Sequence, residues 1–397
     1  MNQGDIRPLD GVLVLSFEHA VAAPFCTRLL ADMGARVIKV ERPGVGDFAR
    51  GYDDRVRGMS SHFTWINRSK ESLTLDLKSD ASQEVLGSLL PKVDVLVQNL
   101  APGAIGRLGL SYDQLRDRYP RLICCDISGY GKGGPYEQKK AYDLLVQSES
   151  GFLSVTGTPE EMTKAGVSIA DSSTGFFAYS NILAALMLRE RTGEGSHIDM
   201  SMLETMVEMM GFPLYYAFDG AEPPARAGAH HATIYPYGPF QVADDETVML
   251  GLQNQREWVK FCEEVIEEPD MAYDERYASN NLRQKNREDL NIRIKGKLIA
   301  MSKDELIERL DKCGIANASV NDMHDVWEHE QLKARNRWRM VNTPVGEVAA
   351  PLPPGVNDKF EYRMDPVPGL GQHSEAILED LGFASDRISE MKSKGVI

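Results

Sequence analysis

The sequence lacks the features that mark membrane proteins, nucleic-acid binders and disulfide or zinc proteins. No apolar run in its 397 residues reaches about 18 residues, so we expect no membrane-spanning helix. The 44 Lys and Arg residues are outnumbered by 59 Asp and Glu residues, and the net charge of −15 argues against a nucleic-acid partner. The five cysteines include no C-x-x-C pair, so we expect reduced, buried thiols and no bound metal. The polar, acidic start MNQGDIRPLDG does not resemble a targeting peptide, and we expect a cytoplasmic protein.

The glycine fingerprints of nucleotide-binding proteins are also missing. Apolar patterns predict a buried strand at 12–17, a helix at 23–33 and a second strand at 36–40, which form a parallel βαβ unit. The turn after the first strand reads Glu-His-Ala-Val-Ala-Ala-Pro and has none of the glycines of G-x-G-x-x-G. A nicotinamide or flavin enzyme with Glu41 as its ribose-binding acid is therefore disfavoured.

A regular alternation of strand and helix patterns is present instead. Strands are predicted at 72–78, 93–98, 122–127 and 197–200, with helices between and after them at 80–90, 176–191 and 201–212. This order predicts an α/β fold, with a parallel, Rossmann-like sheet in a large domain that spans residues 1–225.

A smaller domain is predicted after the Pro- and Gly-containing stretch at 219–224. Hairpin strands at 238–242 and 247–252, followed by helices at 258–266, 286–301 and 303–313, predict an α+β domain over residues 226–329. Residues 330–397 return to strand-like and helical patterns, and we expect them to rejoin the large domain.

Cations and an amide gather in the loops that follow the predicted strands. In parallel sheets these loops share one edge, where ligands bind. A group of basic side chains on one edge of an acidic protein favours an anionic ligand. The residues are Arg42, Lys78, Asn99, Arg107, Lys139 and Lys140.

Asp171 lies where a helix is predicted to begin. Apolar residues recur at helical spacing from Phe176 to Met187, and Arg191 and Gly193 mark the far end. Free N–H groups and the helix dipole at such a position favour an anion and can stabilise an oxyanion. Asp171 is therefore either a helix cap or a carboxylate nucleophile that the helix start keeps ionised.

Several long motifs occur in an order that resembles a known family. They are PLDG at 8–11, GARVIKVE at 34–41, NRSK at 67–70, LDLK at 75–78, QNLAPG at 98–103, SGYG at 128–131, DSSTG at 171–175 and PGLGQH at 368–373. These motifs, over essentially the whole chain, resemble the class III (CaiB–BaiF type) coenzyme A transferases, which include formyl-CoA transferase and, more distantly, 2-methylacyl-CoA racemase.

The resemblance implies that Asp171 is the catalytic nucleophile and that the enzyme holds no permanently bound cofactor. Its substrates would be an acyl-CoA and a carboxylic acid, and the chain would form an interlocked homodimer. The residues that the resemblance assigns to CoA are Val21, Ala22, Arg42, Leu75, Asp76, Leu77, Lys78, Asn99, Leu100, Ala101, Arg107, Lys140, Ala141, Tyr142 and Asp143.

Two departures from the family's patterns bear on the substrate. The racemase branch has Gly-His-Asp where this chain has Ala141-Tyr142-Asp143, and a phenol is a poor base for an α-proton at neutral pH. The glycine run of formyl-CoA transferase has no counterpart at 226–240. We therefore expect CoA transfer from succinyl-CoA to a dicarboxylate such as itaconate, mesaconate, citramalate or malate.

The distal carboxylate of that acceptor would meet Arg226, His230 or His231, although these side chains are equally consistent with surface or subunit contacts. The alternatives are a 2-methylacyl-CoA racemase or epimerase, a formyl-CoA:oxalate transferase and a non-catalytic CoA-binding protein.

Overall fold

A computed structural model describes residues 6–397, which form two compact units. The first unit contains the residues up to Ser150 together with Ala165–Met210 and Gln331–Ile397. The second contains Gly151–Lys164 and Gly211–Glu330. The second unit thus begins before the division expected at residue 225. It also contains residues 151–164, a short excursion of the chain out of the first unit.

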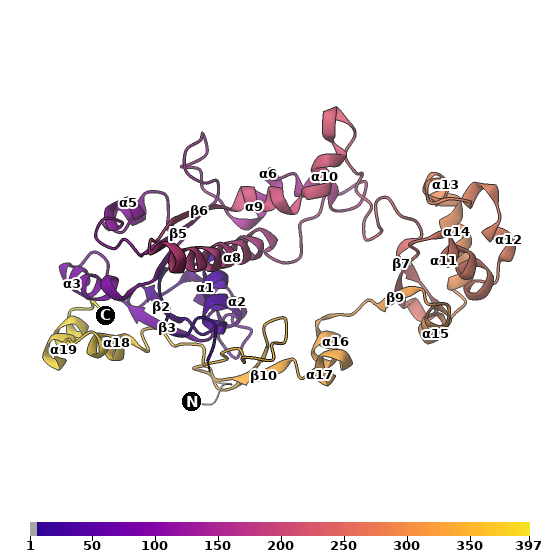
Figure 1. The fold of residues 1–397 in the computed structure, drawn as a ribbon. Helices are drawn as coiled ribbons and strands as arrows, with labels where there is room; N and C mark the ends of the chain where they lie inside the picture. Colours follow the sequence, from indigo (N-terminus) through magenta and orange to yellow (C-terminus); the bar gives the residue numbers. More distant parts are fainter. Residues whose placement is uncertain (1–5) are drawn as a thin grey trace. The chain divides into compact units, whose positions relative to one another are not determined.

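A six-stranded parallel sheet forms the centre of the first unit, which confirms the predicted α/β fold (Figure 1). The strand order is β3-β2-β1-β4-β5-β6, and every neighbouring pair is parallel. The strands are β1 (Leu13–Phe17), β2 (Arg36–Glu41), β3 (Lys70–Thr74), β4 (Val95–Gln98), β5 (Ile123–Ser128) and β6 (His197–Ser201).

Strand β3 begins earlier than the alternation at 72–78 predicts. Lys70 lies inside the strand because its ammonium group is buried against the Glu18 carboxylate at 2.7 Å. Residues 75–78 form a turn instead, in which the Asp76 side chain accepts the N–H of Lys78 at 3.1 Å.

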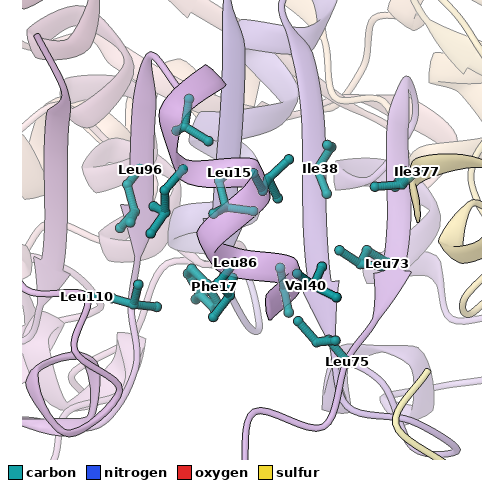
Figure 2. Packing of buried hydrophobic residues seen from close by; sticks show 14 of the residues in the cluster. Leu15, Phe17, Ile38, Val40, Leu73, Leu75, Leu86, Leu96, Leu110 and Ile377 are labelled. Carbon is teal, nitrogen blue, oxygen red and sulfur yellow. The ribbon is translucent and has the colours of Figure 1, made fainter. Parts of the chain in front are cut away.

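Helices cover both faces of the sheet. On one face α1 (Ala22–Asp32) and α8 (Ile169–Thr192) pack against each other and against residues such as Val14 and Val97. On the other face α3 (Asp80–Leu89), α18 (Ser374–Asp380) and α19 (Ser385–Ser393) join a second core with β1 to β5 (Figure 2). Adjacent Cys124 and Cys125 belong to the two different cores, which confirms that they point to opposite faces and are buried thiols.

The C-terminal segment contacts strand β3 of the large sheet. The His373 ring accepts the N–H of Ser72 at 3.1 Å, and the Ser374 hydroxyl accepts the N–H of Thr74 at 3.0 Å. The other elements of this unit are η1 (Phe48–Gly51), α2 (Ser61–Ile66), η2 (Leu90–Lys92), α4 (Ala104–Arg107), α5 (Tyr112–Leu115), α6 (Asp143–Glu149), α9 (Met202–Met209), α17 (Glu330–Ala334) and a hairpin of β10 (Trp338–Val341) with β11 (Val348–Pro351).

The second unit is α+β, with its own core around Trp258 and Tyr277. The predicted hairpin is present as β7 (Tyr237–Gln241) and β8 (Thr247–Gly251), and β9 (Ala316–Ser319) adds a third antiparallel strand. Its helical elements are α7 (Phe152–Val155), α10 (Gly211–Tyr216), η3 (Phe218–Gly220), η4 (Ala243–Asp245), α11 (Gln255–Lys260), the π-helical η5 (Phe261–Val265), α12 (Pro269–Ala272), η6 (Glu275–Tyr277), α13 (Asn280–Lys285), α14 (Arg287–Leu298), α15 (Lys303–Cys313) and α16 (Met323–Glu328). Within residues 6–397 no helix combines the length and the apolar character that crossing a membrane requires.

Candidate active site

The carboxyl edge of the sheet carries the predicted site. The strand order reverses between β1 and β4, and the crevice at such a reversal is the usual ligand site of an open parallel sheet. Asn99, directly after β4, bridges this point: its side-chain oxygen accepts the N–H of His19 at 2.9 Å, and its amide donates to the His19 carbonyl at 2.8 Å. Asn99 therefore fixes the turn after β1 through the backbone.

Four buried charged side chains also support the turn after β1. Lys39 contacts Glu18 at 3.3 Å and Asp47 at 2.8 Å, and Lys70 contacts Glu18 at 2.7 Å. The two ammonium and two carboxylate groups are all fully buried, so their charges must compensate one another. Asp47 also accepts the N–H of Ala20 at 3.1 Å, and Ala20 has a φ of 61°, a strained conformation that this anchor maintains.

The cluster also sets the ionisation of its members. Burial alone would raise the pKa of Glu18, but the ammonium groups of Lys70 and Lys39 outweigh it and lower that pKa. Burial lowers the pKa of Lys70 to about 8, against the attraction of Glu18. At neutral pH both ions are therefore charged, and the turn is held by ion pairs.

Asp171 is the third residue of α8, one turn inside the position that a cap would occupy. The cap position is Ser168, which makes no side-chain capping bond. The first-turn N–H groups are nevertheless engaged: those of Ala170 and Asp171 donate to the Asp143 carboxylate at 2.8 and 3.1 Å, and that of Ile169 donates to the Val167 carbonyl at 2.8 Å. The expectation of free N–H groups for an anion or oxyanion is therefore wrong here.

The Asp171 carboxyl is also harder to ionise than its place near a helix start suggests. Burial, and then the negative charge of Asp143, raise the pKa of Asp171 to about 7. The prediction that the helix start keeps this carboxylate ionised is thus corrected, because desolvation and the neighbouring carboxylate act in the opposite direction. A carboxyl group with a pKa near neutrality can take up and release a proton in the pH range in which most enzymes work.

An aromatic residue that the sequence patterns did not single out, Tyr52, is influenced by the charge of Asp171. Burial, followed by the charges of Asp47 and Asp171 and the phenol of Tyr142, raises the pKa of Tyr52 to about 12. Tyr52 belongs to a run of ring contacts: it packs on Phe48 at 5.8 Å, Phe48 stacks on His19 at 5.3 Å, and the His62 ring meets Tyr52 edge to face at 5.3 Å. The only signal in the sequence was the position of these residues in loops that follow β1 and β2.

Four of the predicted cations are free to meet an anion. Arg42, Lys78, Arg107 and Lys140 are exposed, and none of them forms an ion pair within the described part of the chain. Arg42 follows β2, Lys78 follows the turn after β3, Arg107 ends α4 and Lys140 precedes α6. Lys139, in contrast, is paired with Glu149 and lies over the ring of Tyr136.

The remaining residues assigned to CoA differ in exposure. Val21, Ala22 and Leu75 are buried, so only their backbone can meet a ligand. Tyr142 is 68 % exposed, and Ala141 packs so closely on Gly129 that a Cβ at Gly129 would lie 2.1 Å from that of Ala141. Asp76, Leu77 and Leu100 are half-buried, Ala101 is exposed, and the carboxylate of Asp143 is committed to α8.

The residues expected to bind a distal carboxylate lie in the second unit and are largely committed to its own structure. Arg226 donates to the carbonyls of Thr158 and Pro159 at 2.8 and 2.9 Å. The Nδ1 of His231 accepts the N–H groups of Thr233 and Ile234 at 3.1 and 3.0 Å. His230 packs between aromatic rings, with Nδ1 buried.

Glu41 is likewise unavailable as a ribose-binding acid. Its two oxygens accept from Arg50 at 2.8 and 2.7 Å and from the Ser72 hydroxyl at 2.6 Å. This arrangement agrees with the absence of a dinucleotide fingerprint.

Known proteins resemble this chain over its whole length. Residues 9–374 match the family model described as CoA-transferase family III. The chain is 32% identical to "Succinyl-CoA:glutarate CoA-transferase" of Homo sapiens, covering 100% of this chain and 91% of that protein. It is 33% identical to "Succinyl-CoA:mesaconate CoA-transferase" of Haloarcula hispanica, covering 95% and 97%. The crystal structure of a CAIB/BAIF family protein from Brucella suis superposes with a TM-score of 0.85 at 31% identity, covering 95% of this chain and 100% of that one.

Proposed function

Because this chain belongs to CoA-transferase family III, we propose that it moves CoA from succinyl-CoA to a four- or five-carbon dicarboxylate through a covalent intermediate on Asp171. The observation that carries this proposal is the half-buried Asp171 carboxyl at the start of α8, with a pKa raised to about 7. It lies in the unit that carries Arg42, Lys78, Arg107 and Lys140, four exposed cations with no ion pair within residues 6–397.

Asp171 would act first as a nucleophile. Its carboxylate attacks the thioester carbonyl of succinyl-CoA, the C–S bond breaks, and CoA leaves as thiolate while an aspartyl–succinyl anhydride remains. The thiolate then attacks the aspartyl carbonyl, which releases succinate and leaves an aspartyl-CoA thioester. The acceptor carboxylate displaces the thiolate to form a second anhydride, and the thiolate takes the acceptor's acyl group and frees Asp171.

The phosphates of CoA would be held by Arg42, Lys78, Arg107 and Lys140. These cations lie in the segments that follow β2, β3, β4 and β5, and each lacks a carboxylate partner within residues 6–397. The backbone of Val21 and Ala22, fixed by Asn99 and the buried charge cluster, would contact the ligand where the chain turns into α1.

The acceptor class is supported by the names of two relatives. One is named for glutarate and the other for mesaconate, both five-carbon dicarboxylates, and both are named for succinyl-CoA. Itaconate, citramalate and malate share the two carboxylates and belong to the same panel. His230 and the Nε2 side of His231 remain the candidate contacts for the second carboxylate, while Arg226 is the weaker candidate because carbonyls already occupy it.

The test is a panel of acids offered with succinyl-CoA. Glutarate, mesaconate, itaconate, citramalate, malate and oxalate are each incubated with enzyme, and new CoA esters are followed by mass.

Asp171→Ala is expected to lower turnover by a factor on the order of 10³ or more and to leave CoA affinity within about threefold. Near-normal turnover by Asp171→Ala would overturn the proposal, and Asp113→Ala, at an exposed carboxylate on α5, is the control.

A racemase or epimerase is the second candidate. The position after Ala141 is a tyrosine rather than the histidine of that branch, and Tyr142 points largely to solvent. Solvent deuterium should therefore not enter the α-position of a 2-methylacyl-CoA. Exchange without any acceptor acid would favour the racemase, and a CoA ester of oxalate formed from formyl-CoA would favour the formyl-CoA:oxalate transferase.

We also propose that two copies of the chain form the functional enzyme, as an interlocked homodimer. Large apolar side chains on α8 are exposed in the single chain, among them Phe176 (55%), Met187 (64%) and Leu188 (54%). A second copy would bury them. Analytical ultracentrifugation should give twice the mass of 44.2 kDa, and a stable monomer at micromolar concentration would contradict this part.

A further inference from the structure

The start of α8 is held by a carboxylate from another helix. Asp143, the first residue of α6, accepts the N–H of Ala170 at 2.8 Å and that of Asp171 at 3.1 Å through the same oxygen, Oδ1. Ala170 and Asp171 are the second and third residues of α8, and the N–H groups of the first turn have no acceptor within their own helix. Ser168, at the cap position, makes no side-chain capping bond, so Asp143 supplies the missing acceptor.

A second residue fixes the orientation of Asp143. The buried amide of Gln147 donates to the other oxygen of Asp143, Oδ2, at 2.6 Å, and its carbonyl oxygen accepts the N–H of Ala165 at 3.0 Å. Both oxygens of Asp143 are therefore engaged by this chain, which leaves its carboxylate poorly placed for a ligand. The resemblance assigns Asp143 to CoA, whereas its hydrogen bonds run to the residue that carries the nucleophile.

We propose that Asp143 is a positioning residue for the Asp171 nucleophile, which it serves by capping α8 and by placing a negative charge beside the Asp171 carboxyl, rather than a contact of CoA. This inference rests on the proposed function of Asp171. The hydrogen bond from the backbone N–H of Asp171 to the Asp143 carboxylate fixes the position of the Asp171 backbone, and therefore of its Cβ. The negative charge of Asp143 disfavours ionisation of Asp171 and makes its carboxylate more basic. Among the described residues, the charge of Asp143 on α6 raises the pKa of Asp171, and the charge of Asp171 in turn raises the pKa of the Tyr52 phenol, which follows η1.

Asp143→Asn separates the charge from the hydrogen bonds. An asparagine side-chain oxygen can still accept the two N–H groups of α8, but the negative charge is gone. The acidic limb of kcat/KM, which we expect near pH 7 in the parent enzyme, should move about one pH unit lower. The dissociation constant for CoA, measured by calorimetry, should stay within about threefold, because no cation that would hold CoA is altered.

Asp143→Ala removes both the charge and the acceptor. We expect kcat to fall on the order of 100-fold, with KM for the acyl-CoA nearly unchanged, because the helix start that carries Asp171 loses its anchor. Asp143→Glu keeps the charge, so its acidic limb should remain at the parent value even where kcat falls. This pair of outcomes still decides the question if Asp143→Asn fails to fold.

The matched control is Asp322→Asn. Asp322 accepts the N–H groups of His324 and Asp325 at 2.7 and 2.9 Å as the exposed cap residue of α16, in the second unit. The same change from acid to amide is thus made at a helix start that does not carry Asp171. This variant should leave the pH profile unchanged. A general effect of losing a helix cap would appear in both variants, whereas an effect on the nucleophile appears only at Asp143.

Two results would overturn the inference. One is an acidic limb of Asp143→Asn that coincides with that of the parent enzyme, and the other is a tenfold or greater loss of CoA affinity in Asp143→Asn with kcat preserved, as a direct contact would give. A parent enzyme that transfers CoA to none of the acids would instead contradict the proposed function, so the two failures are distinguishable.

Discussion

The ionised Asp171 carboxylate lowers the free energy of unfolding of the protein at and above neutral pH. Its pKa in the folded chain is about 7, whereas an unperturbed aspartate ionises near 3.9. The protonated form is therefore favoured by folding, and the stability associated with it is complete below about pH 4 and is lost as the pH rises through about 7. The reactive group and the stability of the fold thus compete at this one side chain.

Asp171→Asn should consequently stabilise the protein at alkaline pH. At pH 8 we expect the free energy of unfolding to rise by about 2 kcal/mol, which is half of the full linkage value of about 4 kcal/mol because the side chain is partly exposed. Thermal unfolding of the variant and the parent, followed at pH 8 and at pH 4, measures the difference. The gap should close at pH 4, and a constant gap across that range would show that Asp171 does not titrate in it.

The buried cations Lys39 in β2 and Lys70 in β3, which support the turn after β1, give a second prediction at this scale. Lys70→Met should cost about 3–5 kcal/mol, because it removes one of the two ammonium groups that face the fully buried Glu18 carboxylate. Lys78→Met, at an exposed and unpaired lysine, should change stability by less than about 0.5 kcal/mol and weaken CoA binding instead. Urea unfolding and calorimetry of both variants check the contrast, which equal stability losses would contradict.

At the scale of elements, α8 depends on a close approach to α1. Gly175 lies one turn after Asp171, and a Cβ there would come within 2.6 Å of the Ala22 carbonyl oxygen. Helix and turn are thus in contact at the residues assigned to the nucleophile and to CoA. The glycine allows this approach, which any larger residue would prevent.

Gly175→Ala should therefore destabilise the first unit by about 1–3 kcal/mol and reduce transfer activity, since the start of α8 must move away from the turn. Gly87→Ala is the control: Gly87 lies in α3 with open space around it, and alanine there should stabilise by about 0.5–1 kcal/mol. Differential scanning calorimetry distinguishes the two, and an equal gain in both variants would refute the close-contact argument.

Sequence patterns predicted most of the strands, the hairpin and α15 with its bounds, because each is determined by residues within the element. Sequence patterns did not predict those features that depend on a residue far away along the chain. The start of α8 depends on Asp143, 28 residues away from Asp171, and Lys70 lies in β3 only because Glu18, 52 residues away, neutralises it. The influence of Asp171 on Tyr52 was missed for the same reason, since only the fold brings the loop after β2 close to α8.

At the scale of the whole chain, the C-terminal segment completes the first unit. The carbonyl of Val396 accepts the N–H of Asp76 at 2.7 Å, so the last residues hold the turn 75–78 that is assigned to CoA. Sequence patterns predicted that the segment returns, but not that it reaches this turn, because a backbone carbonyl leaves no signature in the residue types.

Deletion of residues 396 and 397 should therefore raise the dissociation constant for CoA by about three- to tenfold, through loss of one hydrogen bond to the turn. Met391→Ala, in α19, keeps that carbonyl and should instead lower stability by about 2–5 kcal/mol, with CoA affinity retained. Calorimetric titration with CoA and thermal unfolding of both proteins separate the two effects. Unchanged CoA affinity after the deletion would contradict the assignment of turn 75–78.

The bond from Ala165 to Gln147 has a consequence for how the enzyme can vary. The chain leaves the first unit at Gly151 and re-enters it at Ala165. The side-chain oxygen of Gln147, about one helical turn before Gly151, accepts the N–H of Ala165 at 3.0 Å. The two ends of the excursion 151–164 are thus joined by this hydrogen bond. The same Gln147 side chain also donates to Asp143, which accepts the first N–H groups of α8. Because both ends of the excursion are tied to the first unit next to Asp143, we expect insertions or deletions within 151–164 to be tolerated without moving the start of α8.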